Sequence, residues 1–211
     1  MNKKDSSFSI VMTVYDQARS LEEHLPAFLS QEYEPGYEVI VVDESSTDDT
    51  DDVLKLLKQA HANLYSTFIP KQRLNATPHK MALSIGIKAA KNEWVILTDI
   101  NNVPNSDTWL AELADATDKT TDAVIGYFTK KRLRLQSFEE ASQTRKLVGK
   151  EERKRKKASK GGLLKYRCGR YDFVAVRREK AYEVLKYFEQ DIKTPRLLGM
   201  RLSVFLHNCF S

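Results

Sequence analysis

The chain has 211 residues, of which 41% are apolar and 30% charged, and its formal net charge is +5. This length and composition allow the core of one ordinary domain, which excludes a disordered chain. No run reaches the roughly 20 apolar residues that span a bilayer, and the first residues do not resemble a signal peptide. Two widely separated cysteines, Cys168 and Cys209, exclude a disulfide scaffold or a zinc site. We therefore expect a cytoplasmic globular protein.

Apolar residues with the pattern of buried strands alternate with apolar residues at helical spacing along about the first 130 residues. Ser20 with Glu23 predicts a capping box at the start of the first helix, and Pro26 predicts a kink or a later start. Thr77 and Pro78 predict the start of a later helix. The alternation indicates an α/β fold with a parallel sheet and helices on both faces. Continuous apolar runs predict strands at 9–15, 37–42, 64–69, 94–97 and 123–127.

Three of these strands end in an acidic residue. The acids are Asp16 after the first strand, Asp43 after the second and Asp99 after the fourth. Parallel strands bring these ends to one edge of the sheet, where α/β folds bind ligands, and clustered acids there call for a cation or a ligand. No glycine-rich dinucleotide fingerprint or GxxxxGK[ST] loop is present. A ligand must therefore be held mainly by side chains and a metal.

Asp99 and Asn101 are candidate metal ligands. They lie two residues apart, so in extended geometry both side chains point to the same side. Oxygen ligands in this arrangement suit a Mg²⁺ or Mn²⁺ that carries a phosphate. The alternative is that Asp99 only opens a turn, which Asn101 caps.

The motifs around these acids resemble those of family 2 glycosyltransferases. SIVMTVYDQARSLEEHLPAFLSQEYEPGYEVIVVDESSTDDT resembles the opening of that family, and HKMALSIGIKAAKNEWVILTDINNVPNSDTWL resembles the part that contains its D-x-D element. The resemblance covers about residues 8–127. It implies a GT-A fold, a three-layer α/β/α sandwich with a mostly parallel central sheet. We expect one domain over 1–211, with a nucleotide-sugar-binding half at about 8–127, a basic helical insertion at 128–162 and a reduced acceptor-side half at 163–211.

The resemblance also implies roles for individual residues. Asp43 would bind the base, and Lys80 would lie near the diphosphate unless it is a solvated lysine of the helix face. Asp99 and Asn101 would hold the ribose and a Mg²⁺ or Mn²⁺, which neutralises charge on the leaving group. By position, the donor-binding residues are Thr13, Val14, Tyr15, Asp43, Glu44, Lys80 and Asp99.

The sequence departs from the family pattern at three points. Asn101 replaces the second D-x-D acid, and a neutral amide holds a cation less firmly than a carboxylate. Ser45 replaces the usual glycine, which disfavours a positive φ there. No copy of the family's E-D-x-D element, which supplies the catalytic base, is found. Asp172 and Asp191 are candidates for that base; alternatively, Asp172 caps or pairs with an arginine and Asp191 closes a helix.

The C-terminal part contains a basic run and three predicted elements. Arg153 to Lys157 are all basic within a polar, helical stretch at 137–160, and their spread around a helix favours a solvated segment. The alternative is contact of 150–160 with an anionic membrane, at its inner face. No specific nucleic-acid motif accompanies the run. We expect a strand at 171–178, a helix at 179–188, and at 197–210 a helix docked on the core or lying at a membrane interface.

The leading hypothesis is a metal-assisted glycosyltransferase that moves a sugar from a nucleotide-diphosphate sugar to a glycan or lipid-linked acceptor. The second is a catalytically weak or inactive relative that binds a nucleotide sugar or a partner protein. It rests on Asn101 and the missing E-D-x-D element. The third is a nucleic-acid or membrane adaptor built on the basic run.

Overall fold

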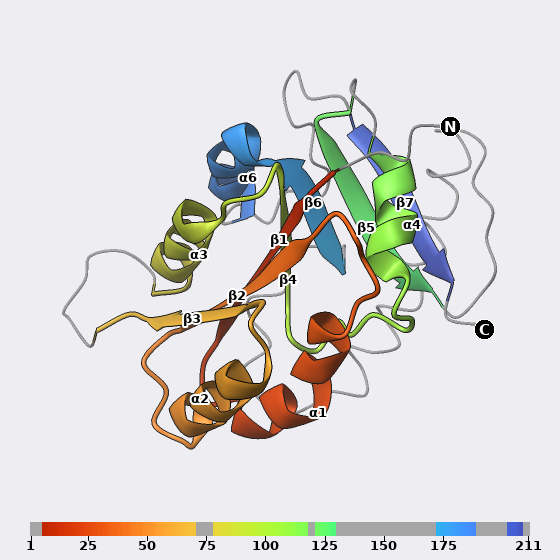
Figure 1. The fold of residues 1–211 in the computed structure, drawn as a ribbon. Helices are drawn as coiled ribbons and strands as arrows, with labels where there is room; N and C mark the ends of the chain where they lie inside the picture. Colours follow the sequence, from red (N-terminus) through yellow and green to blue (C-terminus); the bar gives the residue numbers. More distant parts are fainter. Residues whose placement is uncertain (1–5, 71–77, 118–120, 130–171, 189–201, 209–211) are drawn as a thin grey trace, which may run out of the picture.

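The computed structural model describes residues 6–70, 78–117, 121–129, 172–188 and 202–208, and every structural statement below concerns these residues. Strands and helices alternate through the first five strands, as the apolar periodicity predicts. In chain order the elements are β1 Phe8–Val14, α1 Ala18–Leu29, β2 Tyr37–Asp43, α2 Thr50–Ala60, β3 Leu64–Phe68, α3 Pro78–Ala89, β4 Trp94–Thr98, α4 Trp109–Ala116, β5 Ala123–Thr129, β6 Phe173–Arg177, a 3-10 turn Arg178–Lys180, α6 Ala181–Phe188 and β7 Leu202–Asn208 (Figure 1).

The strands form one seven-stranded sheet in the order β3-β2-β1-β4-β6-β5-β7. Strand β6 is antiparallel to both of its neighbours, and the other strands run in one common direction. The predicted α/β fold with a mostly parallel sheet is confirmed. The ends of β1, β2, β3 and β4 share one side of the sheet, which we name the carboxyl edge. We name the opposite side, where these strands begin, the amino edge.

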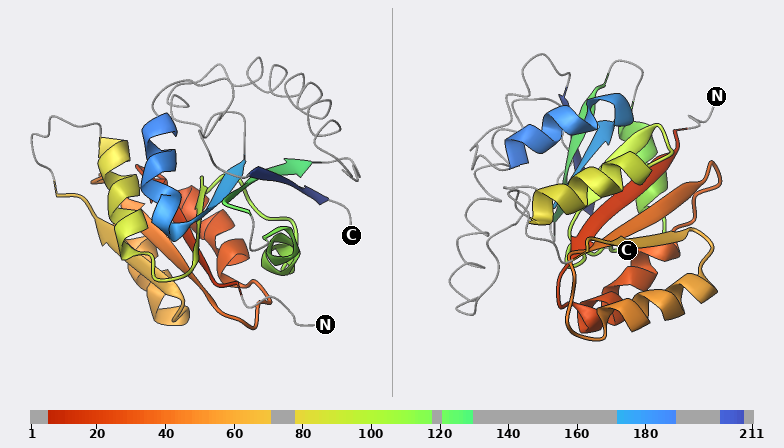
Figure 2. Two further views of the ribbon diagram at one scale, coloured as in Figure 1. Left: turned by 90° about the horizontal axis from the view of Figure 1, so that it is seen from above. Right: turned by 90° about the vertical axis from the view of Figure 1, so that its left-hand side faces the viewer.

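Helices cover both faces of the sheet, which gives three layers (Figure 2). Helices α1, α2 and α4 pack on one face, and α3 and α6 on the other. Helix α3 approaches the sheet closely at Gly86, because a Cβ there would lie 2.4 Å from Val11 Cγ1 and 3.3 Å from Val42 Cγ2. The absence of a side chain at Gly86 therefore sets the spacing between α3 and strands β1 and β2.

The start of α1 differs from the prediction. The helix begins at Ala18, so Ser20 lies inside it, and the predicted capping box is wrong. The cap comes from a neighbouring turn, because Asp48 Oδ2 accepts from the Ala18 N–H at 3.0 Å. Pro26 lies within the helix, which continues to Leu29.

The end of the chain also differs from the prediction. Residues 202–208 form strand β7, in parallel register with β5 from Ala123↔Leu202 to Thr129↔Asn208. The predicted helix at 197–210 is therefore wrong over these residues. Apolar residues at 202, 204 and 206 have the period of two that a strand requires, and a sheet edge was present to pair with. Strand β6 and helix α6 lie where the sequence predicts them. None of the described helices is long and apolar enough to cross a membrane.

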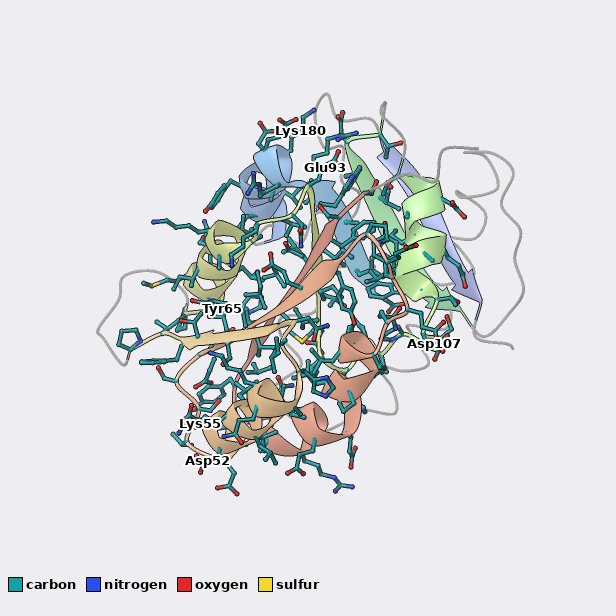
Figure 3. The ribbon with its side chains drawn as sticks, in the orientation of Figure 1. Asp52, Lys55, Tyr65, Glu93, Asp107 and Lys180 are labelled. Atoms are coloured by element: carbon teal, nitrogen blue, oxygen red, sulfur yellow. The ribbon has the colours of Figure 1, made fainter. Side chains whose placement is uncertain are left out.

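Ion pairs link neighbouring segments of the chain at the amino edge. Arg177 Nη1 lies 2.6 Å from Glu93 Oε1, and the Arg177 guanidinium stacks 4.9 Å from the ring centroid of Trp94. Lys180 Nζ lies 3.0 Å from Asp122 Oδ1, whose side chain is buried. Glu93 and Lys180 are labelled at this end of the molecule in Figure 3. These contacts join β4, β6 and the start of β5 at the end of the sheet that lies away from the predicted site.

Candidate functional site

The turns after β1 and β2 are bonded to each other at the carboxyl edge. Asp16 has a φ of 49°. Its Oδ1 accepts from the Thr47 N–H at 2.7 Å, and its own N–H donates to Ser46 Oγ at 2.9 Å. The Asp16 carboxylate therefore holds the neighbouring turn in place. This acid, which follows the first predicted strand, thus joins the turns after β1 and β2.

Asp48 links two helix starts in the same region. Its Oδ1 accepts from the Thr50 N–H at 3.1 Å, and its Oδ2 accepts from the Ala18 N–H at 3.0 Å. Burial alone would raise the pKa of Asp48, but the hydrogen bonds from Thr50 and Ala18 outweigh it and hold the pKa below its ordinary value. The first backbone N–H of each helix, that of Ala18 in α1 and that of Thr50 in α2, thus has a partner in Asp48.

Asp43 lies at the end of β2, in register with Val14 of β1. It is nearly buried, and its Oδ1 accepts from the Ser46 N–H at 3.0 Å and the Ser46 hydroxyl at 2.5 Å. The neighbouring Ser45 has a φ of 66°, so the expectation that serine avoids a positive φ is wrong here. The Ser45 hydroxyl donates to the Ile69 carbonyl, which offsets part of the cost of that conformation.

A histidine that sequence reasoning missed lies beside these residues. His79 Nδ1 is 2.8 Å from Glu44 Oε1 and 3.0 Å from Thr13 Oγ1. His79 is the second residue of α3, so this contact brings β1, the β2–α2 turn and α3 together. Two of the predicted donor-binding residues, Thr13 and Glu44, are thereby joined. His79 begins the stretch that resembles the family's second part, but its contact could not be predicted from the sequence, because it depends on how α3 lies against the sheet.

Asp99 and Asn101 form a compact turn after β4. Asp99 Oδ1 accepts from the Asn101 N–H and from the Asn101 side-chain Nδ2, both at 2.8 Å. The Asn102 N–H donates to the Asp99 carbonyl at 2.9 Å. Asp99 therefore opens a turn, as the alternative interpretation predicts, and its role as a metal ligand stays a prediction. In this arrangement Asn101 points a donor, not an oxygen, at Asp99.

The described residues fit a divalent ion only in part. They contain no group of three or more His, Cys, Asp or Glu side chains arranged to hold a metal. Asp99 offers one carboxylate, and the amide oxygen of Asn101 could serve only after the side chain turns. Mg²⁺ is commonly held by one or two carboxylates together with substrate phosphates. The donor set therefore fits an ion that arrives with a diphosphate.

Asp172 lies beside the Asp99 turn. Its carbonyl accepts from Asn102 Nδ2 at 2.6 Å and from Thr98 Oγ1 at 3.1 Å. The reason is the direction of β6, which runs opposite to β4 and so begins at the carboxyl edge. Asp191, the other candidate base, and the basic run at 150–160 lie outside the described residues.

The remaining predicted donor-binding residues differ in exposure. Tyr15 is 43% exposed at the carboxyl edge, whereas the Val14 side chain is buried in the core. Val14 can therefore contribute only backbone, and its carbonyl accepts from the Glu44 N–H at 2.9 Å. Lys80 follows His79 in the first turn of α3 and is partly exposed.

Comparison with known proteins identifies relatives of this chain. Residues 9–185 match the family described as Glycosyl transferase family 2. A poly(ribitol-phosphate) beta-glucosyltransferase of Bacillus spizizenii is 26% identical over 119 residues, which cover 56% of this chain and 18% of that protein. The chain thus spans less than a fifth of the length of this curated relative.

Solved structures show the same fold. A mannosyltransferase of Pyrobaculum calidifontis in complex with GDP-Man and Mn²⁺ matches with a TM-score of 0.61 and 18% identity, over 93% of this chain and 54% of that one. A glucosyl-3-phosphoglycerate synthase of Mycobacterium tuberculosis, in complex with Mn²⁺, UDP and glucosyl-3-phosphoglycerate, matches with a TM-score of 0.56 and 16% identity, over 96% of this chain and 70% of that one.

Proposed function

Because the chain belongs to glycosyl transferase family 2, we propose that it transfers a sugar from a nucleoside-diphosphate sugar to the hydroxyl group of a glycan or lipid-linked acceptor. The observation that carries the proposal is the meeting of Asp43, Glu44 and Asp99 at the carboxyl edge of the sheet. Acids from separate parts of the chain gather there, at the end of the sheet where α/β folds bind ligands.

The residues at this edge have distinct tasks in the proposal. Asp43, whose Oδ1 is occupied by Ser46, would offer its second oxygen to the N–H groups of a base. Asp99 would orient the ribose and the diphosphate, and Lys80 would offset diphosphate charge. A divalent ion bound there would neutralise charge on the leaving diphosphate. The two similar solved structures are complexes with Mn²⁺ and with GDP-Man or UDP, which supports this choice of ligands.

Asp172 is the proposed group that takes the proton of the acceptor hydroxyl. Its backbone carbonyl accepts from Asn102 and Thr98, so Asp172 lies beside the Asp99 turn at the carboxyl edge, where the donor would bind. A general base must come within hydrogen-bond distance of the acceptor hydroxyl. The division into a donor half at 8–127, a basic insertion at 128–162 and an acceptor half at 163–211 is part of the proposal. Contact of residues 150–160 with a membrane at its cytoplasmic face is also part of the proposal.

One observation favours a second candidate, a relative that binds a nucleotide sugar without transferring the sugar efficiently. Asn101 donates to Asp99 where a second acid would otherwise add charge, and the described residues contain no three-ligand metal group. A weakly held ion would stabilise the leaving group less well. Binding would then persist while turnover falls.

Two measurements separate these candidates. Melting of the full chain with UDP or GDP and Mn²⁺ should raise the midpoint under both, because a ligand that binds the native state stabilises it by mass action. Hydrolysis of UDP-sugars or GDP-sugars should then occur for the transferase and be absent for the binder. If none of the nucleotides changes the midpoint, both candidates fail.

A further inference from the structure

The side chain of His79 lies between two elements of the proposed donor site. An ionised carboxylate only accepts hydrogen bonds, so His79 Nδ1 carries a proton and donates it to Glu44 Oε1 at 2.8 Å. Thr13 Oγ1, at 3.0 Å, lies within reach of the same proton. The His79 side chain is 28% exposed and that of Glu44 15%. Both side chains are therefore partly shielded from solvent.

His79 lies in the first turn of α3, so its contact with Glu44 holds the start of this helix. Helix α3 packs on β1 and β2 (Figure 1). Gly86, in the second half of the helix, allows its close approach to the sheet. His79 provides a second fixed point in the first turn, next to Lys80. Two fixed points along a helix restrain both its tilt and its rotation. The position of the backbone from which Lys80 extends then depends in part on the contact between His79 and Glu44.

The same contact changes the expected role of Glu44. Family resemblance places Glu44 among the groups that bind the donor, but one of its oxygens is bonded to His79. We infer that His79 is a positioning residue: through Nδ1 it fastens the first turn of α3 to Glu44 and Thr13, and so directs Lys80 toward the donor diphosphate. This inference rests on the proposed function, because it takes the donor to be a nucleoside-diphosphate sugar.

Two substitutions of His79 distinguish the roles of its two ring nitrogens, Nδ1 and Nε2. His79→Asn places an amide nitrogen near the position of Nδ1 and can still donate to Glu44, whereas His79→Gln places its amide near Nε2 and cannot. We expect His79→Gln to raise the Kd of the nucleoside diphosphate with Mn²⁺ by about tenfold, the scale seen when an orienting partner is lost. His79→Asn should stay close to wild type. Titration calorimetry of the full chain with UDP and with GDP measures both.

A double-mutant cycle tests whether His79 acts through Lys80. Lys80→Ala should also raise the Kd by about tenfold, and His79→Gln should add little in the Lys80→Ala background, because coupled residues are not additive. His61→Gln is the matched control, since His61 lies beyond the end of α2 and outside the proposed site. Its Kd should equal that of wild type. Melting of each variant without nucleotide checks that it folds.

The outcomes distinguish the inference from the function on which it rests. If wild type binds neither nucleotide, the proposed function fails and the inference falls with it. If wild type binds and His79→Asn is as weak as His79→Gln, positioning through Nδ1 is wrong. Additive effects of His79→Gln and Lys80→Ala, or no effect of Lys80→Ala, would likewise overturn it.

Discussion

The two edges of the sheet use charge in different ways. At the amino edge, Arg177 pairs with Glu93 and Lys180 with Asp122, so opposite charges from distant segments neutralise each other. At the carboxyl edge, the acids are bonded mainly to backbone N–H groups and hydroxyls, as Asp16, Asp43 and Asp99 show. Such partners hold a carboxylate in place but leave its charge uncompensated.

This difference predicts which edge serves stability and which serves binding. Ion pairs between segments contribute to folding and present no net charge to a ligand. Ordered carboxylates that keep their charge attract a cation, and their positions are already set before it arrives. Variants at the two edges should therefore affect different measurements.

The largest effect is expected at Asp99. Asp99→Asn keeps an oxygen that can accept from the Asn101 N–H but removes the charge. We expect the rate of sugar transfer or donor hydrolysis to fall by about 100-fold or more, because the neutral amide would hold less firmly the cation that neutralises charge on the leaving diphosphate. Urea unfolding without ligand should be almost unchanged. Retained activity would show that the carboxyl edge does not need this charge.

The reverse result is expected at Arg177. Arg177→Met removes the ion pair with Glu93 and the stacking on Trp94 while keeping an apolar side chain. The free energy of unfolding should fall by about 1–2 kcal/mol in urea titration. Nucleotide affinity should not change. A loss of affinity at equal stability would mean that the two edges are not independent.

Asp48 should affect stability although it lies at the carboxyl edge. Asp48→Ala removes the acceptor for the N–H groups of Ala18 and Thr50, and should lower the free energy of unfolding by about 1 kcal/mol. Asp49→Ala is the matched control, because Asp49 is the N-cap residue of α2 but makes no side-chain capping bond. It should unfold like wild type.

The pH dependence of the Asp48 effect follows from the direction of its pKa shift. The folded state lowers the pKa of Asp48, so the carboxylate contributes stability above the unfolded value and loses it as the pH falls through the folded value. The difference between wild type and Asp48→Ala should be constant from pH 5 to 7 and shrink below about pH 4. A difference that grows on acidification would contradict this assignment.

The smallest effect on folding is expected at Asn101. Asn101→Asp replaces a donor to Asp99 with a second carboxylate, so the chain without metal should lose about 0.5 kcal/mol of stability. Mn²⁺ should then raise the melting midpoint more than it does for wild type, because a cation relieves the repulsion. If neither value changes, position 101 does not lie beside the metal.

Sequence patterns predicted the half of the fold that depends on local periodicity. Buried runs such as Trp94 to Leu97 define strands by themselves, and parallel order then places Asp43 and Asp99 at one edge. The direction of β6 could not be predicted, because it depends on pairing with β4, which precedes it by more than seventy residues. The short apolar run in β7 was ambiguous between helix and strand until its pairing with β5 was known.

The parts of the site that the sequence did not predict depend on contacts between distant segments. Asp48 caps a helix thirty residues before it, and no local capping pattern marks this. His79 contacts Thr13, sixty-six residues before it. Such pairs follow from the packing of α1 and α3 on the sheet, and become visible only when those helices are in place.

Ser45, which follows β2 and has a positive φ, limits which amino acids can occupy this position. Glycine would adopt the backbone of Ser45 without strain, but it would lack the hydroxyl that donates to the Ile69 carbonyl. The Ser45 side chain therefore adds a second bond between this turn and the residue after β3, beside the one from the Ile69 N–H to the Asp43 carbonyl, and a glycine would lack it. Alanine would combine the strain of a side chain with the loss of that bond, so a library of variants at position 45 should retain serine and glycine and be depleted of alanine.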